Sequence, residues 1–282
     1  MDSPEDTPQA VVDSPQLLPQ SAFVAIVMLS DVVELSGRAL SDMLKSLPRS
    51  CSAELETVHP EGASARITLG DRQYSLMLVA KPVPVDSLRD AIHDRSDDSS
   101  TEAVSDHQAH LVVACLQPGE EMGERVLAAA GVQLLAAMAG EPLGALAVLW
   151  VESNQLADWT RFAKDARLLV SAFETDDTTV FPARYWVNTL LFADGKKTGG
   201  RSLGLTGFTG YELYLEPVKW PAEDVQARMV GTIEYLFEQG PVLQHGQTLG
   251  ATEDERFQIS LDDEGETLRL TLEGHFGAER TP

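Results

Sequence analysis

The order of apolar and polar positions predicts strands and helices in turn along the first 93 residues. The apolar run AFVAIVMLS, residues 22–30, is typical of a buried strand. Apolar residues then recur at helical spacing from Leu40 to Leu47, behind Ser36, whose hydroxyl suits a helix N-cap. The runs CSAELETV, ARITL and RQYSLMLVA predict three strands, and the Gly-Asp pair at 70–71 predicts a two-residue hairpin turn. With a short helix in VDSLRDAIH, the order is βαβββα.

A second series of elements follows a polar stretch at residues 93–106, which has almost nothing to bury. AHLVVACLQ and GALAVLWVES are typical of strands, and residues 120–139 predict a helix that ends at Gly140. An apolar face from Trp159 to Phe173 predicts a further helix, and RYWVNTLLFA is strand-like. The order in this region is therefore βαβαβ.

The C-terminal region begins with a glycine-rich stretch, DGKKTGGRSLGLTGFTG, at residues 194–210. Its six glycines favour a long flexible connection, which leads into the strand YELYLEP. Pro221 at a first helical position and an apolar face running to Phe237 predict a helix that Gly240 ends. Alternating apolar residues on both sides of DDEGE predict a terminal hairpin.

These elements together indicate the α+β class, with mixed sheets and helices packed on one face. Two related ferredoxin-like halves would give this pattern, although no internal repeat is strong enough to prove a duplication. Residues 1–20 are proline-rich, acidic and without periodicity, so we expect a disordered tail. We expect an N-terminal half at 21–95, a linker at 96–106 and a C-terminal domain at 107–276.

Composition narrows the choice of partners. The chain has 282 residues and a formal charge of −23, which repels phosphate backbones and anionic lipid surfaces. We therefore expect neither nucleic acid nor a membrane as a partner. Such a field serves solubility, or it steers the protein towards a partner protein with a basic surface.

The cysteines and the apolar runs indicate a cytoplasmic protein. Only Cys51 and Cys115 are present, and neither belongs to a CxxC arrangement, which suits a reducing compartment. The N-terminus has no signal-peptide pattern, and no run approaches about 18 uninterrupted apolar residues. We expect no membrane span.

The glycine-rich stretch fails the spacing tests for a phosphate-binding loop. A P-loop places a glycine five residues before Gly-Lys-Ser/Thr, but Leu190 occupies that position and Lys197 follows Gly195 and Lys196. GLTGFTG spaces its glycines GxxGxxG, whereas a dinucleotide fingerprint needs GxGxxG before a helix. We therefore expect these glycines to let the main chain bend and not to hold an anion.

No other motif specifies a catalytic or metal site. His107 and His110 form HxxH next to a predicted strand, where the two rings are not presented together as on a helix. No nucleophile motif accompanies Cys115, which we interpret as a buried small hydrophobe. The four tryptophans suit core packing, with interface anchoring as the alternative. We predict no catalytic residues, no metal and no cofactor.

Part of the C-terminal region resembles a known family. RSLGLTGFTGYELYLEP and VGTIEYLFEQGPVLQHGQTLG with its continuation are similar to the bacterial domain-of-unknown-function family catalogued as four-two-six-one, and AHLVVACL is more weakly so. TGFTGYEL lacks the proline of the commoner family form. The resemblance implies no assigned catalytic residue and no cofactor. The matching positions are Gly204, Leu205, Phe208, Glu212, Gly240, Gly246, Thr248 and Gly250.

The leading hypothesis is a non-enzymatic, cytoplasmic protein that binds another protein. By analogy, the resemblance implies an immunity or adaptor role in a bacterial toxin or secretion system. The alternative is a small-molecule-binding protein or hydrolytic enzyme with a pocket between the two halves, using Glu212, His110 or Lys197. The residues expected to contact a partner are Lys197, Arg201, Phe208, Tyr211, Glu212 and Glu216.

Overall fold

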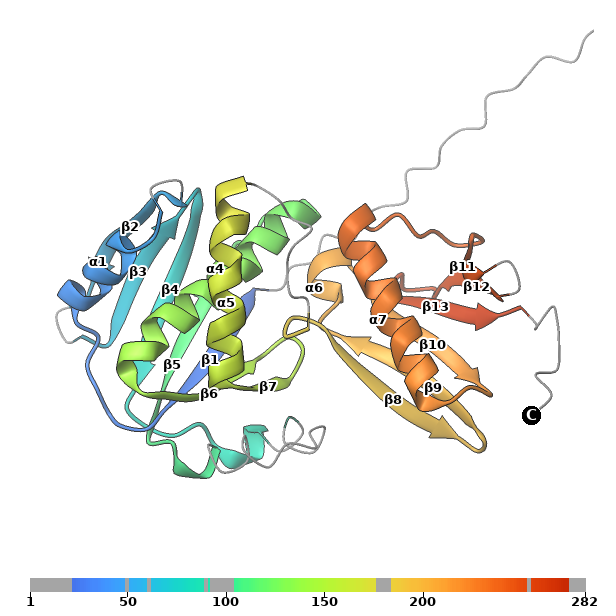
Figure 1. Cartoon of the computed structure of the whole chain (residues 1–282), viewed down its shortest axis with the longest axis horizontal. Coiled ribbons are helices and arrows are strands. Elements are labelled where there is room, and N and C mark those ends of the chain that lie inside the picture. Colours follow the sequence, from blue (N-terminus) through green and yellow to red (C-terminus); the bar gives the residue numbers. More distant parts are fainter. Residues whose placement is uncertain are drawn as a thin grey trace, which may run out of the picture.

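The protein folds into two domains, each built on one β-sheet (Figure 1). The computed structural model describes residues 22–48, 51–59, 62–88, 91, 104–175, 184–252 and 255–273. The tail expected at 1–20 and residues 96–103 of the expected linker lie outside the described residues. The α+β class is confirmed, because helices and sheets occur in both domains.

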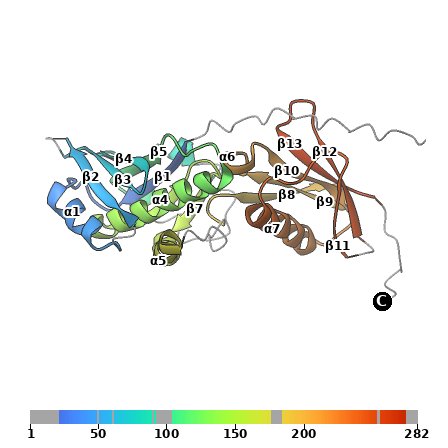
Figure 2. The ribbon, with the colours of Figure 1, turned by 90° about the horizontal axis from the view of Figure 1, so that it is seen from above.

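The first domain runs from β1 to α5. Its elements in chain order are β1 Phe23–Leu29, α1 Gly37–Lys45, β2 Ala53–Val58, β3 Ser64–Leu69, β4 Arg72–Val79, the 3-10 turn η2 Val85–Leu88, β5 Ala109–Cys115, α4 Met122–Gly140, the 3-10 turn η3 Glu141–Leu143, β6 Ala145–Trp150, β7 Gln155–Asp158 and α5 Trp159–Thr175. The sheet order is β2-β3-β4-β5-β1-β6-β7, and every pair is antiparallel. Helices α1, α4 and α5 lie on one face (Figure 2).

Strand β1 is central because it is apolar on both faces. Phe23 and Val27 belong to the main core on the helical side, whereas Met28 packs with Val83 and Leu88 on the opposite side. A strand buried on both faces reads as a continuous apolar run rather than an alternating one. The buried strand predicted at this position is thus confirmed.

Helix α4 is apolar on all sides because it is enclosed. It packs on β1 and β5 and is covered by α5. Residues 122–143 have the length and mean hydropathy, 1.5, of a membrane-crossing helix, but most of this segment is buried inside the protein. A core helix passes the same test of length and composition. Gly131 allows this close packing, because a Cβ there would lie 2.1 Å from the Tyr74 hydroxyl.

Strand pairing divides the chain differently from the expected halves. β5 and β6 follow the expected linker, yet they pair with β1 on its two sides. Because β1 is apolar on both faces, it belongs in the middle of a sheet, and strands distant in sequence fill the two adjacent places. Taken in order, β1, α1, β4, β5, α4 and β6 follow the ferredoxin-like β-α-β-β-α-β succession, with the β2–β3 hairpin inserted.

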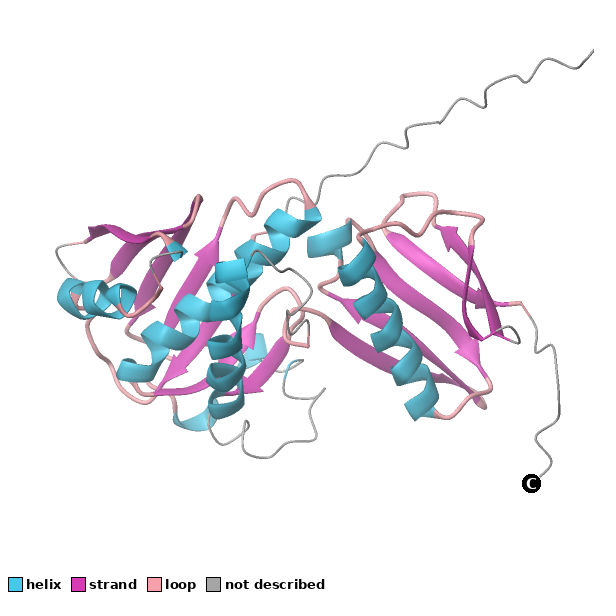
Figure 3. Cartoon of the chain, turned by 45° about the horizontal axis from the view of Figure 1, so that its top comes forward, coloured by secondary structure: helices cyan, strands magenta, loops and turns pink. Residues whose placement is uncertain are grey.

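The second domain has a different connectivity, so the halves are not topological copies. Its elements are β8 Asn188–Asp194, β9 Lys197–Leu203, α6 Thr206–Thr209, β10 Glu212–Val218, α7 Ala222–Gln239, β11 Thr248–Thr252, β12 Glu255–Leu261 and β13 Thr267–Leu272. The sheet order is β11-β12-β13-β10-β9-β8, with β10 and β13 parallel. Helix α7 lies across one face of this sheet (Figure 3).

The glycine-rich stretch is not one long connection, because its first part is strand β9. β9 pairs with β8 over seven residues and with β10 on its other side. Gly199 and Gly200 are needed for contact rather than for bending. A Cβ on Gly199 would lie 2.5 Å from the Phe192 ring, and one on Gly200 would lie 2.9 Å from Cγ of Met229 in α7.

Aromatic rings fill the junction between the domains. Phe208 of α6 stacks on Phe23 of β1 with ring centroids 4.8 Å apart, and Trp186 stacks on Phe208 at 5.7 Å. The Trp186 indole N–H donates to the side-chain oxygen of Gln133 in α4 at 3.0 Å. Trp150 and Trp186 are both almost fully buried. These two tryptophans thus serve core packing, as the sequence favoured.

A buried arginine also joins the two domains. Arg125 of α4 donates from Nε to the carbonyl oxygen of Gly207 in α6 and from Nη1 to that of Gly119. Its guanidinium also lies 5.5 Å from the centre of the Phe23 ring. A buried charge needs such partners because its desolvation is costly. The Arg125 guanidinium therefore has its Gly207 acceptor only when α6 is docked correctly.

Replacing Gly131 with alanine tests the packing of α4. We expect Gly131→Ala to lower the free energy of unfolding by about 2 kcal/mol, because the rigid Tyr74 ring has to move. The measurement is urea denaturation followed by circular dichroism. Gly123→Ala in the same helix is the control, since a Cβ there meets nothing within 4 Å, and it should be neutral or stabilise by up to about 1 kcal/mol. Equal stability of the two variants would contradict the proposed contact.

Candidate functional site

The glycine-rich stretch does form an anion cradle, and the chain's own Glu212 occupies it. One carboxylate oxygen of Glu212 accepts hydrogen bonds from the Gly204 N–H at 2.8 Å and the Thr206 N–H at 3.2 Å. The other accepts from the Leu205 N–H at 3.3 Å and from the Ser202 hydroxyl. Successive amides that point at one anion form a nest. The expectation that this stretch holds no anion is therefore corrected.

This cradle fixes the turn that carries α6. Gly204 has φ +96°, and a Cβ there would lie 2.4 Å from the Trp186 carbonyl oxygen, so glycine is required. The Thr206 hydroxyl adds a fifth hydrogen bond to the carboxylate at 2.9 Å. Glu212 is thus a structural group, and the amides it holds are not open to a phosphate.

The residues predicted to contact a partner do not form one surface. Phe208 and Tyr211 are buried at the domain junction and within the second domain's core, at 2% and 7% exposure. Lys197 and Arg201 are exposed on β9, and Glu216 is half-buried on β10. The aromatic pair therefore serves packing, whereas Arg201 remains accessible. Among the family positions, Leu205 is buried, Gly246 has φ +84°, and Thr248 and Gly250 lie in β11.

The face of the second sheet opposite α7 carries an unusual row of side chains. Arg201, Tyr214 and Arg269 are directly opposite one another on β9, β10 and β13. The Arg269 guanidinium lies 4.9 Å from the centre of the Tyr214 ring, which is cation–π geometry. Phe192 of β8 stacks on the same ring with centroids 5.5 Å apart. We call this surface the open face.

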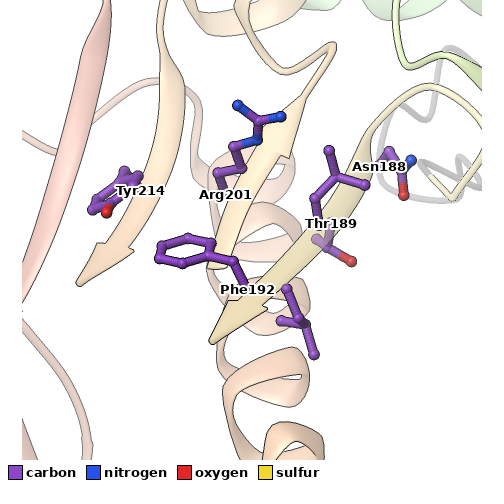
Figure 4. A pocket seen from close by; sticks show the side chains of 7 residues that line it. Asn188, Thr189, Phe192, Arg201 and Tyr214 are labelled. Carbon is purple, nitrogen blue, oxygen red and sulfur yellow. The ribbon is translucent and has the colours of Figure 1, made fainter. Parts of the chain in front are cut away.

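A groove of about 610 Å³ runs along β8 beside the open face and takes lining residues from both faces of that strand. Figure 4 shows the side chains of Arg201, Phe192 and Tyr214 on three neighbouring strands. The groove combines apolar surface with one cation, since Arg201 is its only charged lining residue among those described. Its lining residues are Asn188, Thr189, Leu190, Leu191, Phe192, Arg201 and Tyr214.

The open face combines two arginines, Arg201 and Arg269, with two carboxylates on the same side of β10, Glu212 and Glu216. Within the part of the chain that the structure describes, neither Arg201 nor Arg269 has an ion-pair partner. Of the nearby carboxylates on this face, Glu212 is engaged by its amides, and Glu216 lies further along β10. A site that recognises anionic groups beside apolar ones can therefore exist on an acidic protein.

Sequence reasoning missed Tyr214, Phe192 and Arg269 as members of one surface. Period-two alternation places Glu212, Tyr214 and Glu216 on one face of β10. Because residues 197–203 were predicted to be a loop, Tyr214 had no predicted neighbours on the β9 side of its strand. A signal was available, because a glycine in a strand often marks a close approach by another group.

The groups proposed for an enzymatic pocket between the halves are not brought together. Glu212 is held by the cradle, and Lys197 is exposed beside the β8–β9 turn. His110 lies in the first sheet, where its Nδ1 is 2.8 Å from the Lys81 carbonyl oxygen, and burial lowers its pKa. His107 accepts from the Val83 N–H through Nε2 at 2.7 Å. No cluster of three potential metal ligands occurs among the described residues.

Glu152 is a buried carboxyl group close to the domain junction. Its Oε2 is shielded from solvent and has no hydrogen-bond partner among the described residues. Burial raises the pKa of Glu152 from the ordinary 4.5 to about 7. The adjacent Ser153 donates to the Tyr185 carbonyl oxygen at 2.6 Å, at the start of the second domain. Ionisation of Glu152 therefore affects a region that connects the two sheets.

The comparisons identify only the C-terminal region. Residues 201–271 match the family described as Domain of unknown function (DUF4261), which confirms the resemblance noted in the sequence. The matched stretch contains the anion cradle, α7 and the open-face strands β10 and β13, and it begins after β8. No curated protein and no solved structure significantly matches the chain.

Removing the charge of Glu212 tests the cradle. We expect Glu212→Gln to lower the free energy of unfolding by about 1–3 kcal/mol, because one oxygen acceptor is replaced by an amide donor that faces N–H groups. Chemical denaturation provides the measurement. Glu216→Gln on the same strand and face is the control, and it should change stability by less than about 0.5 kcal/mol. A Glu212→Gln protein as stable as this control would show that the cradle is not structural.

Glu152 predicts a pH-dependent contribution to stability. Its folded-state pKa of about 7 lies above the ordinary 4.5, so its contribution is full below about pH 4.5 and is lost as the pH rises through 7. We expect wild type to lose on the order of 3 kcal/mol relative to Glu152→Gln between pH 5 and pH 8. Parallel urea titrations at the two pH values measure this difference, in which the other titrating groups cancel. A constant difference would place the Glu152 carboxyl in water.

Proposed function

We propose that the protein is a non-enzymatic protein-binding protein that holds its partner on the open face of the second sheet. The observation that supports this proposal is the row Arg201–Tyr214–Arg269, with Phe192 stacked on Tyr214. Arginine and tyrosine are enriched among residues that dominate binding energy at protein interfaces. The Tyr214 ring is already held between the Arg269 guanidinium and the Phe192 ring, so little side-chain entropy is lost on binding.

The arrangement of the second domain supports the same assignment. Helix α7 covers one face of the sheet, while apolar and aromatic side chains remain partly accessible on the other. Antiparallel and mixed sheets commonly leave one face to solvent, but that face is then usually polar. Partly exposed Leu190, Phe192 and Tyr214 depart from that pattern. A contiguous apolar surface with a polar rim is typical of an interaction site.

Charge acts on this partner at two distances. The net charge of −23 would steer a partner with a basic surface during approach. Screening limits such long-range attraction to about 8 Å at physiological ionic strength. Within the contact itself the local charge decides, and there Arg201 and Arg269 favour carboxylates on the partner. We propose a partner that combines a generally basic surface with an acidic residue at the site.

The cellular role that we propose is that of an immunity or adaptor protein in the cytoplasm of a bacterium with a toxin or secretion system. The family that residues 201–271 match has no known function, so this role rests on analogy alone. An immunity protein has to bind tightly without chemistry, and ring-and-arginine anchors in a desolvated contact give slow dissociation.

A small-molecule function is the second candidate, and the groove is the observation that favours it. Its volume of about 610 Å³ lies within the range of ligand pockets, roughly 300–1,000 Å³. This groove lies on one sheet and not between the halves, where rings fill the junction. A ligand here would be an anion that pairs with Arg201 beside the apolar lining of the groove.

Two variants of the open face test the protein-binding function. The tagged full chain is incubated at low salt with lysate of the source cell, and a protein recovered reproducibly is purified and titrated by calorimetry. We expect Arg201→Glu and Tyr214→Ala to weaken binding at least tenfold, because both remove central contacts. Arg38→Glu, on exposed α1 of the first domain, makes the same charge change and should bind as wild type does.

The contrary outcomes separate the two candidates. Equal affinity of all three variants would remove the open face as the contact surface. A small anion found on the purified protein by native mass spectrometry, and lost with Arg201→Glu, would favour the second candidate.

A further inference from the structure

We propose that the edge strand β8 accepts an extended segment of the partner protein as an additional strand, and that this segment places a carboxylate on Arg201. This mode of binding rests on the proposed function, which it makes more specific. Strand addition supplies affinity through main-chain hydrogen bonds, while pockets beside the edge select side chains.

β8 is the least protected of the four sheet edges. The edges of the first sheet are β2, which carries Glu54 and Glu56 and has an irregular register, and β7, which has only four residues. The other edge of the second sheet, β11, has five residues and a register shift. Such shortness, charge and irregularity are the usual means by which edges avoid further pairing.

β8 has less protection, since its one charged residue is Asp194 at its end and its register is regular. Its seven residues, NTLLFAD, pair with β9 in an unbroken register and contain no lysine and no proline. In an antiparallel pair, alternate residues direct their N–H and C=O groups away from the existing partner. No described strand pairs with the outer side of β8, so these groups can pair with an added strand.

Apolar side chains lie on both faces next to this edge. Leu190 and Phe192 belong to the groove on the open face. On the opposite face, Leu191 is 37% exposed beside α7. Val230 of α7, also 37% exposed, lies one turn beyond Gln226, whose side chain bonds to Thr189 of β8. An added strand would cover both sets, so we expect apolar residues on both faces of the partner segment.

Arg201 gives the site its charge preference. It lies directly across from Leu190, one strand in from the edge, on the open face. An added strand would lie about 10 Å from β9, since neighbouring strands are roughly 4.8 Å apart, and an arginine side chain can bridge most of that distance over Leu190. A guanidinium pairs best with a carboxylate, in a two-pronged contact. The partner segment therefore has Asp or Glu facing Arg201.

A second copy of this chain fits the edge less well. Antiparallel pairing of two β8 strands about Leu191 uses all seven residues and sets Leu190 of one chain against Phe192 of the other, with no carboxylate near Arg201. Pairing about Phe192 would set Asp194 against Leu190, near Arg201, but it would use only residues 190–194. Each chain also carries a formal charge of −23, which opposes self-association. We therefore assign the edge to a different polypeptide.

A random 12-residue peptide library displayed on phage, selected on the full chain, tests this proposal. We expect enriched peptides to carry one Asp or Glu among apolar residues and to lack proline in the paired stretch. Synthetic copies should slow hydrogen exchange in residues 188–194 at least tenfold, because free edge amides become paired. Selection on Arg201→Glu should reverse the preference to Lys or Arg, whereas Arg38→Glu should select the wild-type peptides.

Lysine substitutions distinguish strand addition from docking on the open face alone. Leu191→Lys and Leu190→Lys place a charge at the edge, each on a different face, and should weaken peptide binding at least tenfold. Leu116→Lys at an exposed site of the first domain is the matched control. Thermal unfolding shows which variants are folded. The test needs only one folded variant of the two, Leu190→Lys or Leu191→Lys.

Three results would overturn the strand addition. In the first, the selection enriches no peptide. In the second, enriched peptides leave hydrogen exchange in residues 188–194 unchanged. In the third, the free chain forms a dimer in which β8 is protected from hydrogen exchange. If the partner protein loses affinity for Tyr214→Ala but binds Leu191→Lys normally, the open face remains the contact surface and only the strand addition fails. If both variants bind normally, the proposed function fails as well.

Discussion

The structure depends on one interaction, the binding of the Glu212 carboxylate by the amides of residues 204–206. It fixes the turn between β9 and α6, and the turn places Phe208 against Phe23 and the Gly207 carbonyl oxygen against Arg125. A buried cation and a ring stack between domains are favourable only in correct geometry, because a misplaced α6 would remove the Gly207 carbonyl oxygen from Arg125. Glu212 is also the first residue of β10, a strand of the open face. The cradle therefore couples the position of the domain junction to that of the open face.

The cradle explains why the many polar groups of the glycine-rich region do not form a catalytic site. The amides that resemble a phosphate loop are saturated by an internal anion, and the nearby hydroxyls of Ser202 and Thr206 bind the same carboxylate. What remains available lies one strand away. Gly199 lets the Phe192 ring lie across β9, and this ring stacks on Tyr214, which also contacts the Arg269 guanidinium. Gly199 therefore makes room for the side chains of the open face, whereas Gly204 allows the turn that positions α6.

The open face and the β8 edge are adjacent parts of one surface. A sheet with a helix on one face only can bind through its free face, through its edge, or through both. Here the apolar residues of β8 contribute to both, and Arg201 lies where the two meet. The proposed contact includes aromatic rings and an arginine, so its strength would come from a few side chains rather than from area. The acidic remainder of the chain acts at longer range, on the rate of encounter and on solubility.

The elements with local signals were predictable from the residues alone. The continuous apolar run of β1, the amphipathic α7 with Pro221 and Gly240 at its ends, and the terminal hairpin were predictable, because hydrophobic period and capping chemistry act within a few residues. The resemblance of residues 201–271 to a family of unknown function was also recognisable. Only the tertiary structure decided that Gly199 and Gly200 lie in a strand, that β5 and β6 flank β1, that Phe208 and Tyr211 are buried, and that Glu212 fills its own cradle. Each of these depends on contacts between residues that are distant in sequence or on opposite faces of a sheet, and no local pattern records which groups will meet.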